Sequence, residues 1–317
     1  MIITAAELVE AELTRSQRDT LARRATATVA VDWFSSRIEV RFEEPHAAEL
    51  FRARYASFLT HGHEPGMVCH AVVGDDGLPT FWAEPGTSYR YPVPLRSPEI
   101  IAFLLDAIVQ RAFFDVNDAL MSFHAAAVAV DGSAAAISAI STGGKSTTAL
   151  ACARRGFGLY SDERCVLING EVHAFPRAIN LRKDGIELLA SEEIADDGGI
   201  GARVGAHAGR DWEAVSFREL FGNIPLPEPR ELTAIFFIVG RAPVPHVQEL
   251  SIGDSITRLI AAGLSGPQAG LPRVAAALAL FRSSRAFALT LGTPDETAQV
   301  IAATCRSTHE LVGLGAR

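Results

Sequence analysis

Residues 139–146 form a pattern that could bind phosphate groups. They read AISTGGKS, which matches the phosphate-binding loop G-x-x-x-x-G-K-[ST] except at its first position, where Ala139 replaces glycine. In such a loop, backbone N–H groups surround phosphate oxygens, the lysine (here Lys145) reaches the terminal phosphates, and the hydroxyl (here Ser146) binds Mg²⁺. The pattern predicts a site for a nucleoside triphosphate; the alternative is a chance Gly-Gly-Lys-Ser turn.

The flanking sequence predicts the strand and the helix that such a loop requires. Two apolar runs, 127–130 and 134–137, flank Asp131-Gly132, a dipeptide typical of a two-residue β-hairpin. Residues 147–155 are rich in alanine and contain no helix breaker, and Gly156 then predicts the end of a helix. This order would point the positive end of a helix dipole at the loop.

Three further polar residues could meet the loop. Residues 157–160 read as a short strand, and Asp162 and Glu163 follow it. Carboxylates at such a strand end can order Mg²⁺ or its waters, although a solvated acidic turn would have the same sequence. His124 is a lone polar residue in an apolar run, and the hairpin would bring its strand beside the strand that feeds the loop. It is therefore either close to the γ-phosphate or a hydrogen-bonded core histidine.

Taken together, these segments resemble a known family. The similarity lies in four stretches: His124–Val128, Asp131-Gly132, Ser141–Thr147 and Arg155–Glu163. In residue type and spacing they are similar to the C-terminal domain of HPr serine kinase/phosphorylase. Within that family the chain looks most like the stand-alone HPr-kinase-related proteins found beside peptide natural-product genes, some of which phosphorylate a serine of a lasso-peptide precursor.

The resemblance implies a fold and a set of ligands. The fold would be α/β, a P-loop kinase domain of the HPr kinase/PEP carboxykinase type with a curved mixed sheet, and the ligands would be ATP and Mg²⁺. By motif position, Lys145 would contact the β- and γ-phosphates, and Ser146, Asp162 and Glu163 would hold the metal. Asp162 would also act as base, and His124 would lie near the transferred phosphate. Glu163 stands where the family usually has a second aspartate. The implied nucleotide-binding residues are Ser141, Thr142, Gly143, Gly144, Lys145, Ser146 and Thr147.

The predicted function is ATP-dependent transfer of the γ-phosphate to a hydroxyl, with Asp162, His124 and Lys145 as the catalytic residues. The acceptor that the resemblance implies is a serine of a peptide or protein. Two alternatives stay open: a kinase that acts on small-molecule hydroxyls, and a catalytically degenerate nucleotide sensor or scaffold, which Ala139 and Glu163 would favour. The sequence does not distinguish ATP from GTP or pyrophosphate as the donor.

Composition limits the class of protein. A hydrophobic content of 48% and a charged content of 21% are typical of a globular protein. The net charge of −8 disfavours nucleic acid and anionic membranes as partners. Residues 1–10 lack a signal-peptide pattern and no apolar stretch is long enough to span a membrane, so a cytoplasmic protein is expected. The cysteines show no CxxC spacing, which disfavours a zinc ribbon or a disulfide framework. A homo-oligomer stays an option.

The chain is expected to form two domains. Residues 1–95 predict a small α+β N-terminal domain, and residues 96–317 the P-loop kinase domain, with a proline-bearing connection at 92–98 between them. An amphipathic helix at 100–114 is expected to pack on the kinase domain. Further along, Asn169-Gly170 predicts a second hairpin, and the capping box that begins at Thr293 predicts the start of a final helix.

Three other groups of residues have two interpretations each. The cluster His61, His63, Cys69 and His70 could suggest a metal site, but its spacing favours a solvated loop and a strand. The basic residues Arg177, Arg182 and Lys183 either contact a phosphate or a peptide carboxylate, or form a solvated strand end. Residues 195–210 are either a surface insertion or a lid over the acceptor, and residues 196–203 are not expected to pack in a core.

Overall fold

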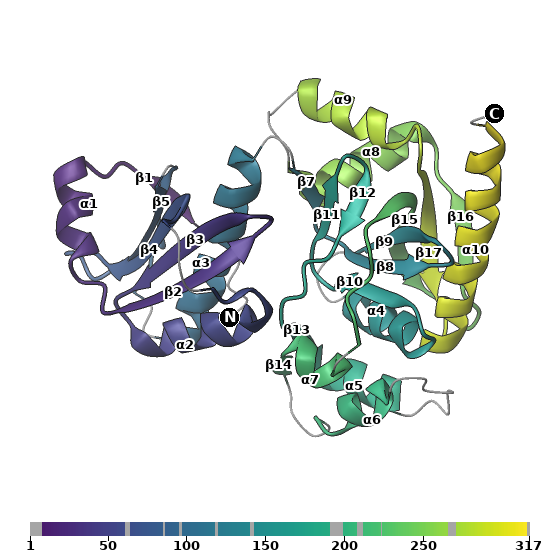
Figure 1. Cartoon of the computed structure of the whole chain (residues 1–317), viewed down its shortest axis with the longest axis horizontal. Coiled ribbons are helices and arrows are strands. Elements are labelled where there is room, and N and C mark those ends of the chain that lie inside the picture. Colours follow the sequence, from purple (N-terminus) through teal and green to yellow (C-terminus); the bar gives the residue numbers. More distant parts are fainter. Residues whose placement is uncertain are drawn as a thin grey trace. The chain divides into compact units, whose positions relative to one another are not determined.

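The computed structural model describes residues 8–60, 64–84, 86–94, 97–117, 120–139, 143–190, 199–207, 212–222, 224–265 and 271–315. The chain is mixed α/β and divides into two compact units, Met1–Val116 and Asn117–Arg317, each built around its own sheet (Figure 1). Within the described ranges, no helix is both long enough and apolar enough to cross a membrane.

The first unit is a six-stranded sheet with helices packed on it, in strand order β1-β6-β5-β4-β3-β2. Only β3 and β4 pair in parallel. Its elements are β1 Val9–Ala11, α1 Arg15–Ala22, β2 Ala27–Trp33, β3 Ser36–Phe42, α2 Pro45–Arg54, a 3₁₀ turn Ala56–Phe58, β4 Met67–Val73, β5 Pro79–Glu84, β6 Ser88–Arg90 and α3 Pro98–Val116.

Aromatic side chains form the core of the first unit. In β2, every second side chain from Val29 to Trp33 is buried, as expected for a strand with one face against a core. The Trp33 ring packs 5.1 Å from the Tyr55 ring just after α2, and 5.3 Å from the Phe113 ring of α3. Such aromatic pairs add about 0.5–1.5 kcal/mol each beyond the area that they bury.

Helix α3 belongs to the first unit, which corrects the sequence-based expectation. It packs against α2, β4 and β5, all of the first unit, and the division of the chain falls after Val116 rather than near residue 95. The helix was expected on the kinase domain because it follows a proline-bearing connection. The sequence shows that the helix is amphipathic but not which sheet its apolar face packs on. In the structure, Phe113 and Phe114 complete the aromatic cluster around Trp33.

The second unit contains a nine-stranded mixed sheet, with the path β10-β8-β9-β15-β12-β11-β7 and with β17 joining β15 to β16. Its first elements are β7 Leu120–Phe123, β8 Ala126–Val130, β9 Ser133–Ser138, α4 Lys145–Arg154, β10 Gly158–Ser161, β11 Cys165–Ile168, β12 Glu171–His173, β13 Ile179–Arg182 and α5 Lys183–Ala190. The remainder are α6 Ile200–Gly205, β14 Trp212–Val215, α7 Phe217–Phe221, β15 Arg230–Arg241, β16 His246–Glu249, α8 Ile252–Ala261, α9 Leu271–Leu280, β17 Arg285–Leu291 and α10 Pro294–Gly315.

This sheet is covered on both faces, as Figure 1 shows for α4 and α10 on one face and α8 and α9 on the other. Successive residues of β9 therefore enter different cores: Ala135 and Ile137 pack with α4 and α10, and Ala134 and Ala136 pack with α8 and α9. Burial on both faces explains why the sequence of β9 is a continuous apolar run rather than an alternating one.

Two hairpins form as predicted from their turn residues. Asp131 and Gly132 have φ values of 44° and 86°, and Asn169 and Gly170 have φ values of 53° and 86°. Positive φ at both central residues is what a type I′ turn requires, and Asp, Asn and Gly tolerate it. The first hairpin makes β8 antiparallel to β9, so β9 runs directly towards residues 139–146.

Strands β9, β15 and β17 run parallel to one another. Their carboxyl ends, at Ser138, Arg241 and Leu291, therefore lie at the same edge of the sheet. In open α/β sheets this is the edge at which ligands bind.

The segment 195–210 differs from its prediction where the structure describes it. Residues 200–205 form α6, and Ile200 and Val204 are buried in the same core as α4. The Gly-rich composition suggested a stretch that cannot pack, but two apolar residues four positions apart are enough for one buried helical face. Residues 195–198 and 208–210 lie outside the described residues.

Candidate active site

The predicted phosphate loop connects β9 to α4, in the order that the chemistry requires. Gly144 is the N-cap of α4 and has a φ of 98°. A Cβ at this position would lie 2.8 Å from Leu291 Cδ1 and 3.0 Å from Arg241 Nη2. Glycine is therefore required for both its conformation and its lack of a side chain.

The replacement at Ala139 causes no backbone strain. Among the described non-glycine residues, positive φ occurs only at Phe34, Ser35, Asp131 and Asn169. Ala139 therefore does not need the freedom that glycine would provide. Ser141 and Thr142, predicted to bind nucleotide, lie outside the described residues.

Lys145, His124 and Glu163 form a charged cluster at the start of α4. The Lys145 Nζ atom lies 2.7 Å from His124 Nε2 and 3.6 Å from a carboxylate oxygen of Glu163. The other Glu163 oxygen lies 3.2 Å from His124 Nδ1. The side chains of His124 and Glu163 are 39% and 27% exposed, so the cluster is open to solvent on one side although Lys145 is buried.

The backbone fixes His124 from two sides. Its N–H donates to the carbonyl of Ala262, and its carbonyl accepts from Ser138 Oγ. The second bond ties the segment before β8 to the last residue of β9, which places the imidazole beside the loop. Of the two interpretations of His124, the structure shows a partly exposed histidine at the loop rather than a core one.

Asp162 and Ser146 form a second pair beside this cluster. Ser146 Oγ donates to Asp162 Oδ2 at 3.1 Å, and Asp162 is only 1% exposed. Its other oxygen, Oδ1, is buried and has no hydrogen-bond partner among the residues that the structure describes. Because a buried carboxylate oxygen without a partner is costly, this atom is a reasonable ligand for a cation.

These residues fit Mg²⁺, which prefers a few oxygen ligands from the protein and retains waters. Ser146 and Asp162 offer a hydroxyl and a carboxylate that already touch, and Glu163 follows in the chain. A site made only of His, Cys, Asp and Glu side chains, three or more together, does not occur within the described ranges. A magnesium site here would therefore depend on the hydroxyl, on waters and on phosphate oxygens.

Arg177 is a buried cation beside this acidic pair. It is 4% exposed, and its Nη2 atom lies 3.6 Å from Glu163 Oε2. Burial alone would raise the pKa of Glu163, but Arg177, Lys145 and the hydrogen bond to His124 hold it well below its usual range. Of the basic cluster named from the sequence, Arg177 is thus at the site, whereas Arg182 and Lys183 are exposed.

The pKa values of Asp162 and Lys145 both shift in the direction that favours the neutral form. Burial raises the pKa of Asp162, and Arg177, Lys145 and the Ser146 hydrogen bond offset this only in part. Burial also lowers the pKa of Lys145, against the opposing effect of Glu163 and Asp162. A carboxylate with a raised pKa accepts a proton more readily, which suits a general base.

Thr147 contacts α5. A Cβ on Gly185 would lie 2.8 Å from Thr147 Oγ1, so α5 packs directly against the first turn of α4. Glycine inside a helix costs about 1 kcal/mol of stability relative to alanine. The close approach of Thr147 explains why α5 nevertheless has glycine at position 185.

The structure therefore brings His124, Lys145, Ser146, Asp162 and Glu163 together, and places Thr147 and Gly144 on a neighbouring face. Sequence reasoning missed Arg241, which contacts the loop at Gly144. The sequence could have indicated this residue, because Arg241 is the first charged residue after the apolar run of β15, at the edge where parallel strands end.

The alternative metal cluster is not assembled in the described part of the chain. Cys69 and His70 are buried in β4, and the His70 ring stacks on Trp82 with centroids 4.3 Å apart. Burial lowers the pKa of His70 to about 4, so it is neutral at pH 7. His61 and His63 lie outside the described residues.

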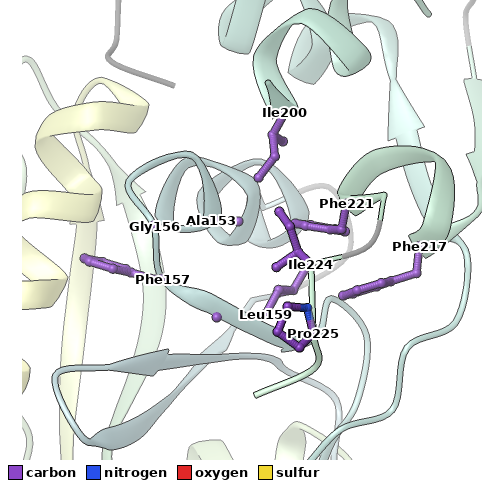
Figure 2. A pocket seen from close by; sticks show the side chains of 10 residues that line it. Ala153, Gly156, Phe157, Leu159, Ile200, Phe217, Phe221, Ile224 and Pro225 are labelled. Atoms are coloured by element: carbon purple, nitrogen blue, oxygen red, sulfur yellow. The ribbon is translucent and has the colours of Figure 1, made fainter. Parts of the chain in front are cut away.

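A hollow lies at the C-terminal end of α4, away from the charged cluster. It has a volume of about 120 Å³, and the side chains that line it are apolar. Figure 2 shows Ile200 and Phe221 entering it from α6 and α7, with Leu159 and Pro225 across from them. This hollow contains no acid, base or nucleophile, so the chemistry is assigned to the charged cluster.

Comparison with known proteins adds little. No protein-family model matches the chain, and no curated protein matches its sequence. Among solved structures, it is similar to the HPr(Ser) kinase/phosphatase from Coxiella burnetii, at 14% identity and a TM-score of 0.30, over 62% of this chain and 93% of that one. A match at this level does not carry an argument about function, so the family resemblance stays a prediction from the sequence motifs.

Proposed function

We propose that this chain is a phosphotransferase that uses a nucleoside triphosphate and Mg²⁺ to phosphorylate a hydroxyl. The observation that carries the proposal is the buried Asp162 carboxylate, with one oxygen bound to Ser146 and the other without a partner among the described residues, beside the start of the glycine-capped helix α4. The loop sequence supports the same conclusion.

Each residue of the cluster has a role in this reaction. Mg²⁺, when bound, would neutralise charge on the β- and γ-phosphates. Lys145 and the N–H groups at the start of α4 would stabilise charge on the transferred group. Asp162 would take the proton of the acceptor hydroxyl as the new P–O bond forms and the bond to the β-phosphate breaks, which releases the nucleoside diphosphate.

His124 and Arg177 would support these residues from either side. His124 contacts both Lys145 and Glu163, so it sets the position of the lysine and could donate to the transferred phosphate. Arg177 balances the negative charge of Glu163 inside the protein. Without such a cation, two adjacent carboxylates would not both stay ionised in a buried site.

For the acceptor, we propose a serine of a peptide or protein. The support is the sequence resemblance to HPr-kinase-related proteins, together with the exposed side of the cluster at His124 and Glu163, which leaves the site open to a large substrate. The proposal includes ATP as donor and a cytoplasmic protein, and no nucleic acid or membrane as partner. A kinase for small hydroxyl compounds remains the second candidate.

The test is a phosphorylation assay with purified protein, Mg-ATP and a panel of serine-containing peptides and small hydroxyl compounds. The expected result is a product heavier by one phosphate group, which Lys145→Ala abolishes. Lys183→Ala is the matched control, because Lys183 is the only other lysine of the chain and is exposed. Binding of Mg-ATP without transfer to any acceptor would instead favour a nucleotide sensor.

A further inference from the structure

Arg241 is a charged residue beside the loop, and the proposed reaction gives it no role. It ends β15, beside β9, which feeds the loop, and beside β17, where it pairs with Leu291. Its Nη2 atom lies 3.0 Å from the position that a Cβ on Gly144 would take. A guanidinium group therefore lies against the glycine that opens α4.

The side chain of Arg241 is exposed and makes no hydrogen bond or ion pair with another described residue. Other described cations near the loop are engaged. Lys145 and Arg177 lie close to Glu163, and Arg155 forms two hydrogen bonds with Asp295. Arg241 is thus available to an incoming anion without breaking a hydrogen bond or ion pair to another described residue.

A small hollow connects Arg241 with the first turn of α4. Its walls include Gly144, Thr147, Leu188, Arg241, Leu291 and Gly292. It lies on the β15–β17 side of the loop, whereas Asp162 approaches from β10 on the other side. The phosphate that is transferred belongs at Asp162 and Lys145, so the remainder of the donor extends towards this hollow. Its volume is about 10 Å³, which is room for about one water molecule, so it can receive a phosphate oxygen but not a nucleoside.

We propose that Arg241 recognises the donor as a nucleotide: its guanidinium binds the phosphate next to the nucleoside. This inference rests on the proposed function, and it decides against pyrophosphate as the donor. Pyrophosphate would occupy the part of the site near Lys145 and would not reach Arg241. A guanidinium–phosphate contact is worth about 1.5–3 kcal/mol, or roughly 10- to 150-fold in affinity.

The test is calorimetric binding of ATP and of pyrophosphate, each with Mg²⁺, to the wild-type chain and to Arg241→Ala. We expect ATP to bind at least about tenfold more weakly to the variant, by the contact energy above, and pyrophosphate binding to change less than about twofold. Arg241→Lys should recover part of the loss, because it restores the charge but not the planar fork. In turnover, KM for ATP should rise with little change in kcat.

Arg230→Ala is the matched control. Arg230 is an exposed arginine at the other end of the same strand, β15, about 35 Å away at 3.3 Å per residue, and its removal should leave both affinities unchanged. If Arg241→Ala binds ATP as tightly as the wild type, or weakens ATP and pyrophosphate equally, the inference is overturned while the proposed function stands. If the wild type binds neither compound, both are overturned.

Discussion

Two clusters of charged side chains, one in each unit, differ in the way that their central carboxylate is satisfied. In the first unit, the Asp106 carboxylate accepts from Arg54, Tyr55 and Gln110. In the second, the Asp162 carboxylate accepts from Ser146 and keeps one oxygen without a partner among the described residues. None of the four side chains of the first cluster has such a buried atom without a partner in the described ranges.

The difference separates a structural role from a chemical one. The first cluster is closed: it joins α3 to α2, and its charges satisfy one another. The second is open, since His124 and Glu163 reach solvent and Asp162 has unused acceptor capacity. Burial of charge alone is therefore not evidence for a catalytic site, because a satisfied pair can simply hold two helices together.

The largest effect should come from Lys145→Ala in the open cluster. We expect phosphoryl transfer to fall by about 10³-fold or more, or roughly 4 kcal/mol, because the charge on the transferred group loses its nearest cation. The free energy of unfolding should change by no more than about 1 kcal/mol, since the desolvation cost of the lysine is removed together with its contacts. Steady-state kinetics and urea unfolding measure the two quantities. A large loss of stability would contradict the contrast.

In the closed cluster, Asp106→Asn should lower the free energy of unfolding and leave activity unchanged. It leaves the Arg54 guanidinium buried without a counter-charge, which we expect to cost about 3 kcal/mol of unfolding free energy. The kcat of the folded protein should not change. The double variant Arg54→Leu/Asp106→Leu should cost less than Asp106→Asn alone, because no unpaired charge remains. If Asp106→Asn and the double variant both retain wild-type stability, the first cluster does not have the structural role assigned to it.

A third buried group, His70, should make the stability of the first unit depend on pH. Its pKa is about 4 in the folded chain because of burial, against about 6.5 when unfolded. The unfolded state therefore binds more protons between these values, and stability is complete above pH 6.5 and is lost as the pH falls towards 4, by up to about 3 kcal/mol. Unfolding followed by tryptophan fluorescence at pH 7.5 and pH 5 measures this loss.

His70→Phe is the control for the pH effect. Phenylalanine keeps the stack on Trp82 and does not titrate, and His70 Nδ1 has no hydrogen-bond partner to lose among the described residues. Stability of this variant should fall less between pH 7.5 and pH 5 than that of the wild type. Equal losses in the two proteins would mean that His70 is protonated in the folded state.

The smallest expected effect is the change in the free energy of unfolding caused by Asp162→Asn. The sign of this change is the most informative result. Because burial raises the pKa of Asp162, its charged form disfavours the folded state at neutral pH, and a neutral amide should raise the free energy of unfolding by up to about 1 kcal/mol. Activity should fall at the same time. Asp106→Asn and Asp162→Asn are the same substitution, so opposite signs of the stability change would support the contrast, and equal signs would refute it.

Local features of the fold were predictable from the sequence, and long-range contacts were not. Asp131-Gly132, Asn169-Gly170 and the capping box at Thr293 each determine structure within a few residues, and all three form as predicted. The packing of α3 on the first unit and of α6 in the second core depends on which apolar surfaces remain to be covered. A single sequence does not state this, because helical periodicity shows that a face is apolar but not what it meets.

The same distinction applies to the candidate site. The positions of Lys145, Ser146, Asp162 and Glu163 follow from one loop and the strand after the next helix, so the motif was enough to name them. His124 required the hairpin register, which the turn residues fixed. Arg241 ends β15, far along the chain, and its approach to the loop depends on the order of strands in the nine-stranded sheet. Arg177 precedes β13, which pairs with β14 in a separate two-stranded sheet. Strand order is set by the whole unit rather than by any one segment.

The most direct test of the central claim is a crystal structure of the chain with Mg²⁺ and a non-hydrolysable triphosphate analogue. The account predicts phosphate oxygens on the backbone N–H groups from Gly143 to Ser146, and the metal beside Ser146 and Asp162 Oδ1. A triphosphate bound elsewhere on the chain, or one bound at the loop with Asp162 and His124 directed away from it, would contradict the account.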